Sequence, residues 1–243
     1  PINLNRDKGN YDNASDIVSW WRMGDSDSGA GNFVTDVIAT DGEALHLDGT
    51  AGNYASVPDA ADLDGFVNFT IEAKGVTLAD WTPAVYQGII SKYNTGAQRS
   101  YRLHLDTSGV LVLTLSFNGV DNFAYTSTAA TGVTDGATAD IMVMRNGEDI
   151  RFYVNGVKLG DDITVVTTAL HNSTDVLALG VAYNVTAYPM TGSMQRARAW
   201  NSAVANQATP TETPVLDVNF ALANKGATSF TATSGQVVTV NST

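Results

Sequence analysis

The 243-residue chain contains no cysteine, which excludes a disulfide framework, a cysteine-based zinc site and a thiol nucleophile. It has no apolar run near the ~20 residues that a membrane-spanning helix needs, and its first residues, PINLNRDKGNY, lack the apolar core of a signal peptide. Basic residues are few: 13 lysines and arginines stand against 25 acidic residues, which gives a formal net charge of −12. Because phosphate binding needs a basic surface, we expect neither nucleic acid nor membrane as a partner.

Helical periodicity is also lacking, and apolar residues instead recur at every second position. The clearest example is the segment 140–160, DIMVMRNGEDIRFYVNGVKLG, where Ile150, Phe152 and Val154 alternate with polar residues. Two Asn-Gly dipeptides, at 146–147 and 155–156, are hairpin-turn signals because both residue types tolerate positive φ. The segment therefore predicts three strands joined by tight turns, and such a unit needs a second sheet to cover its apolar face.

Similar alternation recurs every 10–15 residues and predicts an all-β chain, an antiparallel β-sandwich. We divide the chain into an N-terminal arm (1–16), a sandwich domain (17–205), and a linker with a C-terminal β-hairpin segment (206–243). Strands of that last segment, expected over 215–220, 229–233 and 237–240, either add to the sandwich or pair with another subunit. The further expected strands are 17–23, 45–48, 54–57, 69–73, 88–93, 101–105, 111–117, 175–180 and 192–200.

Five segments, in this order, resemble the laminin-G-like (concanavalin A-like) jelly roll. The resemblance covers residues 17–205 and implies two large antiparallel sheets in a module that binds glycans or proteins. The C-terminal segment also resembles segments that accompany such domains in structural proteins of tailed bacteriophages. The five matching segments are 20–24 (WWRMG), 45–49 (LHLDG) with 54–58 (YASVP), 68–73 (NFTIEA), 141–156 and 192–204.

Calcium is the one cofactor that the resemblance suggests, and the residues at two places bear on whether it is bound. Where relatives commonly have Asp-Asp in the closing strand, which often helps to hold a structural calcium, this chain has Gln195-Arg196. The arginine opposes a cation there. Asp25, Asp27 and Asp36 have a likeness to a calcium loop, but the segment lacks the glycine and the final glutamate of the EF-hand pattern. We therefore interpret it as a polar turn and expect no cofactor, with calcium binding at this loop as the alternative.

Catalysis has little support in the sequence. Some concanavalin A-like relatives are glucanases that use a strand motif of the E-x-D-x-E type, and retaining chemistry needs two carboxyl groups about 5–5.5 Å apart. No such motif occurs here, and the histidines are not spaced as zinc ligands. We assign no catalytic residue, and a glycoside hydrolase is the weakest alternative. The residues concerned are Glu43, Glu72, Glu148, Glu212, His46, His104 and His171.

Aromatic residues in the loops are the best candidates for a binding site. Sugars stack on exposed aromatic faces and accept hydrogen bonds from neighbouring polar groups. The alternative is that these rings pack over the ends of the sandwich or form subunit contacts. The candidate ligand-binding residues are Trp81, Tyr86, Tyr93, Asn94, Tyr183 and Tyr188.

The sequence as a whole favours a non-enzymatic virion protein of a bacteriophage: a capsid decoration, head fibre or tail-associated module. In that hypothesis the chain is a homo-oligomer that contacts other virion subunits and can bind host-surface glycans. The alternatives are a carbohydrate-binding adhesin and a secreted bacterial binding module, which would place the protein outside the cell.

Overall fold

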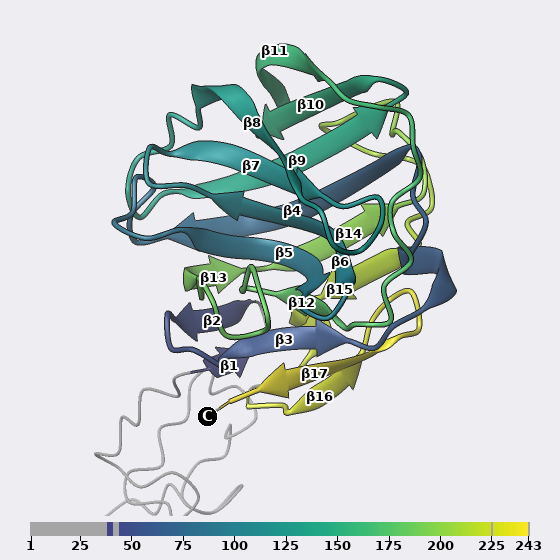
Figure 1. Cartoon of the computed structure of the whole chain (residues 1–243). Helices are drawn as coiled ribbons and strands as arrows, with labels where there is room; N and C mark the ends of the chain where they lie inside the picture. Colours follow the sequence, from purple (N-terminus) through teal and green to yellow (C-terminus); the bar gives the residue numbers. More distant parts are fainter. Residues whose placement is uncertain (1–37, 41–43, 225, 243) are drawn as a thin grey trace, which may run out of the picture. The chain divides into compact units, whose positions relative to one another are not determined.

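Two antiparallel β-sheets overlie each other in the computed structural model, which describes residues 38–40, 44–224 and 226–242 (Figure 1). The predicted arm (1–16), the strand expected over 17–23 and the aspartates of the calcium-like loop lie outside the described residues. No helix in the described part is long and apolar enough to cross a membrane.

The nine-stranded sheet has β4 and β9 at its centre. Its strand order is β1-β2-β13-β4-β9-β10-β11, and β14 joins it by pairing with β4 and β15. The strands are β1 (Ile38–Thr40), β2 (Leu45–Asp48), β4 (Phe69–Leu78), β9 (Thr138–Asn146), β10 (Asp149–Val154), β11 (Val157–Thr164), β13 (Thr191–Met194), β14 (Arg196–Trp200) and β15 (Leu216–Asn219).

The eight-stranded sheet runs in the order β16-β17-β3-β12-β5-β6-β7-β8. Every pairing in both sheets is antiparallel, which confirms the predicted all-β jelly-roll sandwich. The strands are β3 (Tyr54–Val57), β5 (Gln87–Asn94), β6 (Gln98–Leu105), β7 (Val110–Leu115), β8 (Phe123–Ala130), β12 (Leu177–Leu179), β16 (Ser229–Thr231) and β17 (Val237–Asn241); two short 3-10 helices span Ala61–Leu63 and Phe220–Leu222.

Both Asn-Gly dipeptides lie in tight hairpins, but the two turns differ. Between β10 and β11, Asn155 (φ 52°) and Gly156 (φ 73°) are the two central residues, as a type I′ turn requires. Between β9 and β10, Asn146 pairs with Asp149, so the two central residues of this turn are Gly147 and Glu148. The turn is thus centred one residue later in the chain than the Asn-Gly dipeptide. Gly147 (φ 61°) then takes the first central position, which is the pattern of a type II′ turn.

The C-terminal segment completes both sheets. β15 pairs with β14, and β17 pairs with β3, so the hairpin of β16 and β17 lies at the edge of the eight-stranded sheet (Figure 1). Phe220 and Val238 are fully buried in the same core as the other strands. The C-terminal strands therefore add to the sandwich, which is one of the two arrangements that the sequence left open, and the strands they pair with belong to the same chain.

A buried lysine on β5 joins the β3–β4 loop to the β11–β12 loop. The Lys92 side chain is fully buried, and its Nζ donates to Asp59 Oδ1 (2.8 Å), to Asp64 Oδ1 (2.9 Å) and to the carbonyl of Ser173. Asp64 also accepts from the backbone N–H of Ser173. All three ammonium protons are thereby used, which offsets the cost of removing the charge from water.

We expect Lys92→Met to lower the free energy of unfolding by about 3–5 kcal/mol, because it leaves the buried Asp64 carboxylate without its cation. Urea unfolding measures the change. The control is Lys158→Met, which removes an exposed ion pair with Asp162 and should cost less than about 1 kcal/mol. Equal effects of the two substitutions would contradict a structural role for the buried lysine.

Candidate functional site

The outer face of the eight-stranded sheet, turned away from the other sheet, carries charged side chains on its strand β6. Tyr101, Leu103 and Leu105 of this strand lie in the core. Because successive side chains of a strand point to opposite faces, Arg102 and His104 lie on the outer face. The hydrophobic core thus fixes where these two basic side chains are presented.

Residues of the neighbouring strands continue this surface, and we call Arg102, His104, Ser91 and Thr114 together the patch. Arg102 is the register partner of Ser91 on β5 and of Thr114 on β7, so the three residues form a row. Arg102 Nε, His104 Nδ1 and Thr114 Oγ1 are buried and have no hydrogen-bond partner among the described residues. Since buried polar atoms are nearly always paired, this row holds unused hydrogen-bonding capacity.

Four tyrosines gather over this row, and we call them the tyrosine cluster: Tyr86, Tyr93, Tyr183 and Tyr188. Tyr86, at the end of loop 79–86, packs on Tyr188 of loop 180–190 with ring centroids 5.1 Å apart. The Tyr86 ring also packs on His104 at 5.3 Å. Tyr86 and Tyr188 are 37% and 39% exposed, so both offer ring surface to solvent.

The other half of the tyrosine cluster holds the arginine. Tyr93 and Tyr183 lie 5.8 Å apart, and the guanidinium carbon of Arg102 lies 4.8 Å from the Tyr93 centroid and 5.9 Å from the Tyr183 centroid. Arg99 approaches the Tyr93 ring at 5.8 Å. Such contacts attract a cation to the ring face but provide no hydrogen-bond acceptor.

Loop 180–190 is held directly on the sheet. Ser91 Oγ donates to the carbonyl of Ala182 (3.0 Å), and the Gly88 N–H donates to the carbonyl of Tyr188 (2.9 Å). A Cβ on Gly88 would lie 2.1 Å from the Ala182 nitrogen, so only glycine permits this approach. The loop therefore lies on β5 because β5 has no side chain at this point.

The backbone of the same loop is strained. Asn184 and Val185 both have φ of 52°, and Tyr188 has φ of 57°. A positive φ is a rare conformation for a β-branched residue such as valine, and strained backbone persists only where surrounding contacts enforce it. Here the strain accompanies the placement of Tyr183 and Tyr188 on either side of the turn.

Burial keeps the histidine of the patch neutral. Removal from water is the main cause that lowers the pKa of His104 to about 3, and the nearby Arg102 guanidinium lowers this pKa further, against a small opposing effect of Asp106. A neutral imidazole has one nitrogen that donates and one that accepts. The patch consequently presents a fixed arginine charge beside a histidine that stays uncharged at physiological pH.

The structure brings four of the six predicted binding residues together in the tyrosine cluster, buries Trp81 in the core and places Asn94 at the neighbouring β5–β6 turn. Trp81 is 1% exposed within the core, and its indole N–H donates to the carbonyl of Ala137, so its ring cannot stack on a sugar. Asn94 uses its side-chain oxygen to accept from the N–H of Thr95 in the β5–β6 turn. Tyr93 is 4% exposed, so it supports Arg102 and does not offer a free face.

Arg102 and His104 were not among the predicted binding residues. Their alternation with Tyr101, Leu103 and Leu105 was visible in the sequence and placed them on the face opposite the core. The sequence did not show that the loops carrying Tyr86 and Tyr188 fold over that face. Proximity to these two rings makes the pair part of the candidate site.

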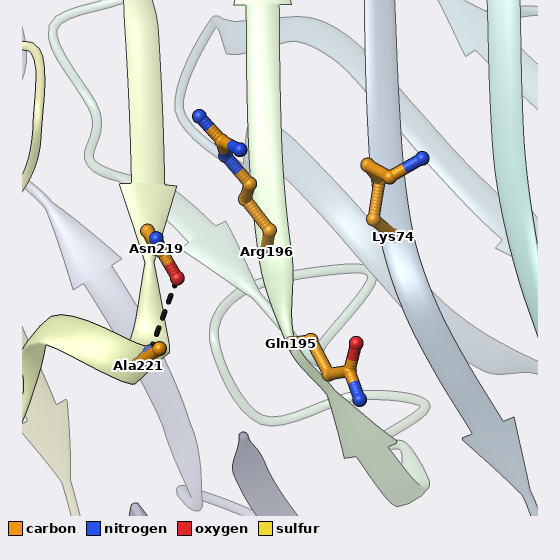
Figure 2. Close-up of a pocket in the computed structure, with 5 residues that line it drawn as sticks. All are labelled: Lys74, Gln195, Arg196, Asn219 and Ala221. Carbon is orange, nitrogen blue, oxygen red and sulfur yellow. Dashed lines mark hydrogen bonds between the residues drawn. The ribbon is translucent and has the colours of Figure 1, made fainter. Parts of the chain in front are cut away.

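The place where relatives commonly have Asp-Asp carries an ion pair of a different kind. Arg196 donates from Nε to Asp217 Oδ1 (2.6 Å) and from a terminal nitrogen to Asp217 Oδ2 (2.5 Å). A hollow of about 380 Å³ lies beside it, and Figure 2 shows its lining residues Lys74, Gln195, Arg196, Asn219 and Ala221. No group of three His, Asp or Glu residues in the described part of the chain could hold a metal ion.

Three of the four glutamates lie in the described residues, on different elements. Glu72 on β4 is buried and paired with Arg198, and burial is the main cause that raises its pKa. Glu148 lies in the β9–β10 turn, and Glu212 accepts from the N–H of Ala205 in the loop before β15. The carboxyl group of Glu72 is thus committed to an ion pair.

The chain belongs to the concanavalin A-like lectin/glucanases superfamily. Residues 48–208 match the family model of that description, the laminin-G-like family Laminin_G_3. No curated protein matches.

Several solved structures share the fold at low sequence identity. A candidate carbohydrate-binding protein from Bacteroides ovatus aligns with a TM-score of 0.61 and 14% identity, over 81% of this chain and 59% of that one. The CBM40 module of the Ruminococcus gnavus IT-sialidase aligns with a TM-score of 0.50 and 16% identity, over 67% and 92%. This chain therefore spans about three fifths of the Bacteroides protein. The predicted virion location and subunit partners stay predictions from the sequence.

Gly88→Ala should displace loop 180–190, because the new methyl group would collide with the backbone at Ala182. We expect a loss of about 1–3 kcal/mol in unfolding free energy and shifted NMR signals of the Tyr183 and Tyr188 rings. Gly147→Ala is the control: no atom lies within 4 Å of its Cβ position, so it should add backbone strain without moving these signals. Unchanged ring signals in Gly88→Ala would refute this role of the glycine.

The pKa of His104 predicts a pH dependence of stability. Between the folded pKa of about 3 and the unfolded value near 6.5, the unfolded chain binds one more proton at this site. The stabilisation is complete above pH ~6.5 and should fall by roughly 1.4 kcal/mol per unit as pH decreases towards 3. Urea unfolding of wild type and His104→Gln measures this effect: the difference between their unfolding free energies should become smaller as the pH is lowered. Parallel pH profiles of the two unfolding free energies would contradict a buried neutral imidazole.

Proposed function

We propose that this protein binds carbohydrate on the outer face of its eight-stranded sheet, at the tyrosine cluster. The observation that carries the proposal is the presence, at one place, of exposed rings and of an arginine without a carboxylate partner among the described residues. Tyr86 and Tyr188 supply ring surface, and the partly exposed Arg102 lies in the same tyrosine cluster. A sugar has the matching surface, with apolar C–H faces and a rim of hydroxyl groups.

The fold comparisons support the same conclusion at a coarser level. The Bacteroides ovatus structure is of a candidate carbohydrate-binding protein, and the Ruminococcus gnavus CBM40 module has also been solved bound to alpha2,6 sialyllactose. These descriptions concern those proteins. For this chain the proposal rests on its own side chains, because a shared fold alone does not transfer a ligand.

The pairing of the charged side chains also distinguishes this patch from the hollow on the nine-stranded sheet. Two cations, Lys74 and Arg196, line that hollow (Figure 2). Lys74 pairs with Asp140 and Arg196 pairs with Asp217, so both cations already have partners. The outer face of the eight-stranded sheet instead combines aromatic surface with unpaired donors. We therefore place the glycan there.

Screening of the whole chain on a glycan array tests the proposal. Tyr86→Ala and Tyr188→Ala should each weaken binding of the glycans found by up to about ten-fold, since an aromatic stacking contact contributes about 0.5–1.5 kcal/mol. The melting temperature should change little, because both rings are partly exposed.

Phe123→Ala provides the matched control for this experiment. Phe123 is 46% exposed on β8 of the same sheet, but it pairs with the core residue Leu115 and its ring packs on Phe117. Its side chain therefore points away from the tyrosine cluster, and the variant should bind like wild type. Absence of binding across the array, or binding that survives both tyrosine substitutions, would overturn the proposal.

A further inference from the structure

Most lysines and arginines in the described part of this acidic chain form ion pairs with carboxylates, and two of the three exceptions lie at one site. Nine lysines and arginines lie in the described residues, and six of them form ion pairs with Asp or Glu. Arg145 lies in the core and donates to the carbonyls of Thr168 and Val166. The remaining two, Arg99 and Arg102, both lie against Tyr93.

These two arginines have no carboxylate partner among the described residues. Arg99 donates to the carbonyl of Val120, whereas Arg102 has only the ring faces of the tyrosine cluster beside it. Asp106, the acidic residue nearest along β6, accepts from Ser108 and from the N–H of Val110, and thus belongs to the β6–β7 turn. The patch is therefore locally positive in a chain whose formal net charge is −12.

The surroundings of Arg102 favour a ligand with two oxygen atoms that share a negative charge. A guanidinium presents its N–H donors as a planar fork that fits carboxylate or sulfate, and these charge-assisted hydrogen bonds are stronger than bonds to neutral hydroxyl groups. The flanking rings of Tyr93 and Tyr183 hold the guanidinium without occupying its donors.

We infer that the glycan bound by the tyrosine cluster is acidic, and that Arg102 binds its carboxylate or sulfate group while Tyr86 and Tyr188 stack on the sugar ring. Arg102 is only partly exposed and has no carboxylate partner among the described residues, so an anion bound at the exposed part of its guanidinium would offset part of the cost of burying the charge. This inference rests on the proposed function, since it names the class of sugar bound at the same site.

Matched oligosaccharides that differ in one group provide the test. The intact protein is titrated with lactose, with sialyllactose as the carboxylate form and with sulfated lactose as the sulfate form. Acidic and neutral glycans are also compared across the array. We expect binding to be confined to acidic glycans, with at least about ten-fold weaker affinity for the neutral counterpart. Preference between the sialylated and sulfated forms identifies which oxyanion fits.

Substitutions then connect that preference to the arginine. Arg102→Gln should weaken binding of the acidic glycans by about ten-fold or more, and Arg102→Lys should restore only part of the affinity because it keeps the charge and loses the fork. Arg151→Gln is the control, since it removes one positive charge from β10 in the other sheet. Affinity should also fall as salt is raised.

The outcomes separate the two proposals. If neutral and acidic glycans bind equally and Arg102→Gln matches wild type, while Tyr86→Ala and Tyr188→Ala abolish binding, the acidic-ligand inference is wrong and carbohydrate binding stands. If no glycan binds, both are wrong. If Arg102→Gln loses binding together with its folded structure, Arg102→Lys decides: a folded Lys variant that binds acidic glycans as tightly as wild type overturns the role of the fork.

Discussion

The alternation of side chains along β6 is the constraint on which the rest of the molecule depends. Tyr101, Leu103 and Leu105 bury their side chains between the sheets, which forces Arg102 and His104 onto the other face. A one-residue shift in register would exchange the two sets, placing an arginine in the core and leucines in solvent. The hydrophobic effect therefore positions the candidate site, although none of its charged groups contributes to the core.

Loop 180–190 lies over that face and places Tyr183 and Tyr188 on it. Its contacts with Gly88 and Ser91 hold a backbone that is strained at Val185 and Tyr188. Because the rings are already fixed by these contacts, a ligand would lose less of its binding energy to ordering the site. Strain of this kind is typical of functional surfaces, and it lies here in the one loop that supplies two of the four tyrosines.

The two outer faces of the sandwich use their charges differently. On the nine-stranded sheet, Glu72, Lys74, Arg196 and Arg198 lie in ion pairs, which leaves the hollow of Figure 2 without a free cation among its lining residues. On the eight-stranded sheet, Arg102 packs on aromatic rings instead. Ion pairs between strands tie the sheet together, whereas a cation held by rings stays available to an anion.

The sequence by itself determined the all-β architecture, the central strands and the hairpin turns, because alternation and Asn-Gly dipeptides are local signals. It missed β8, whose side chains are mostly exposed and show little apolar periodicity. It also assigned Trp81 to a ligand-binding site, and it left open whether the C-terminal strands add to the sandwich or pair with another subunit. Only the tertiary structure decided which rings are exposed and that Tyr86, Arg102 and Tyr188 meet, since contacts between residues so distant in the chain depend on how loops pack over the finished sheet.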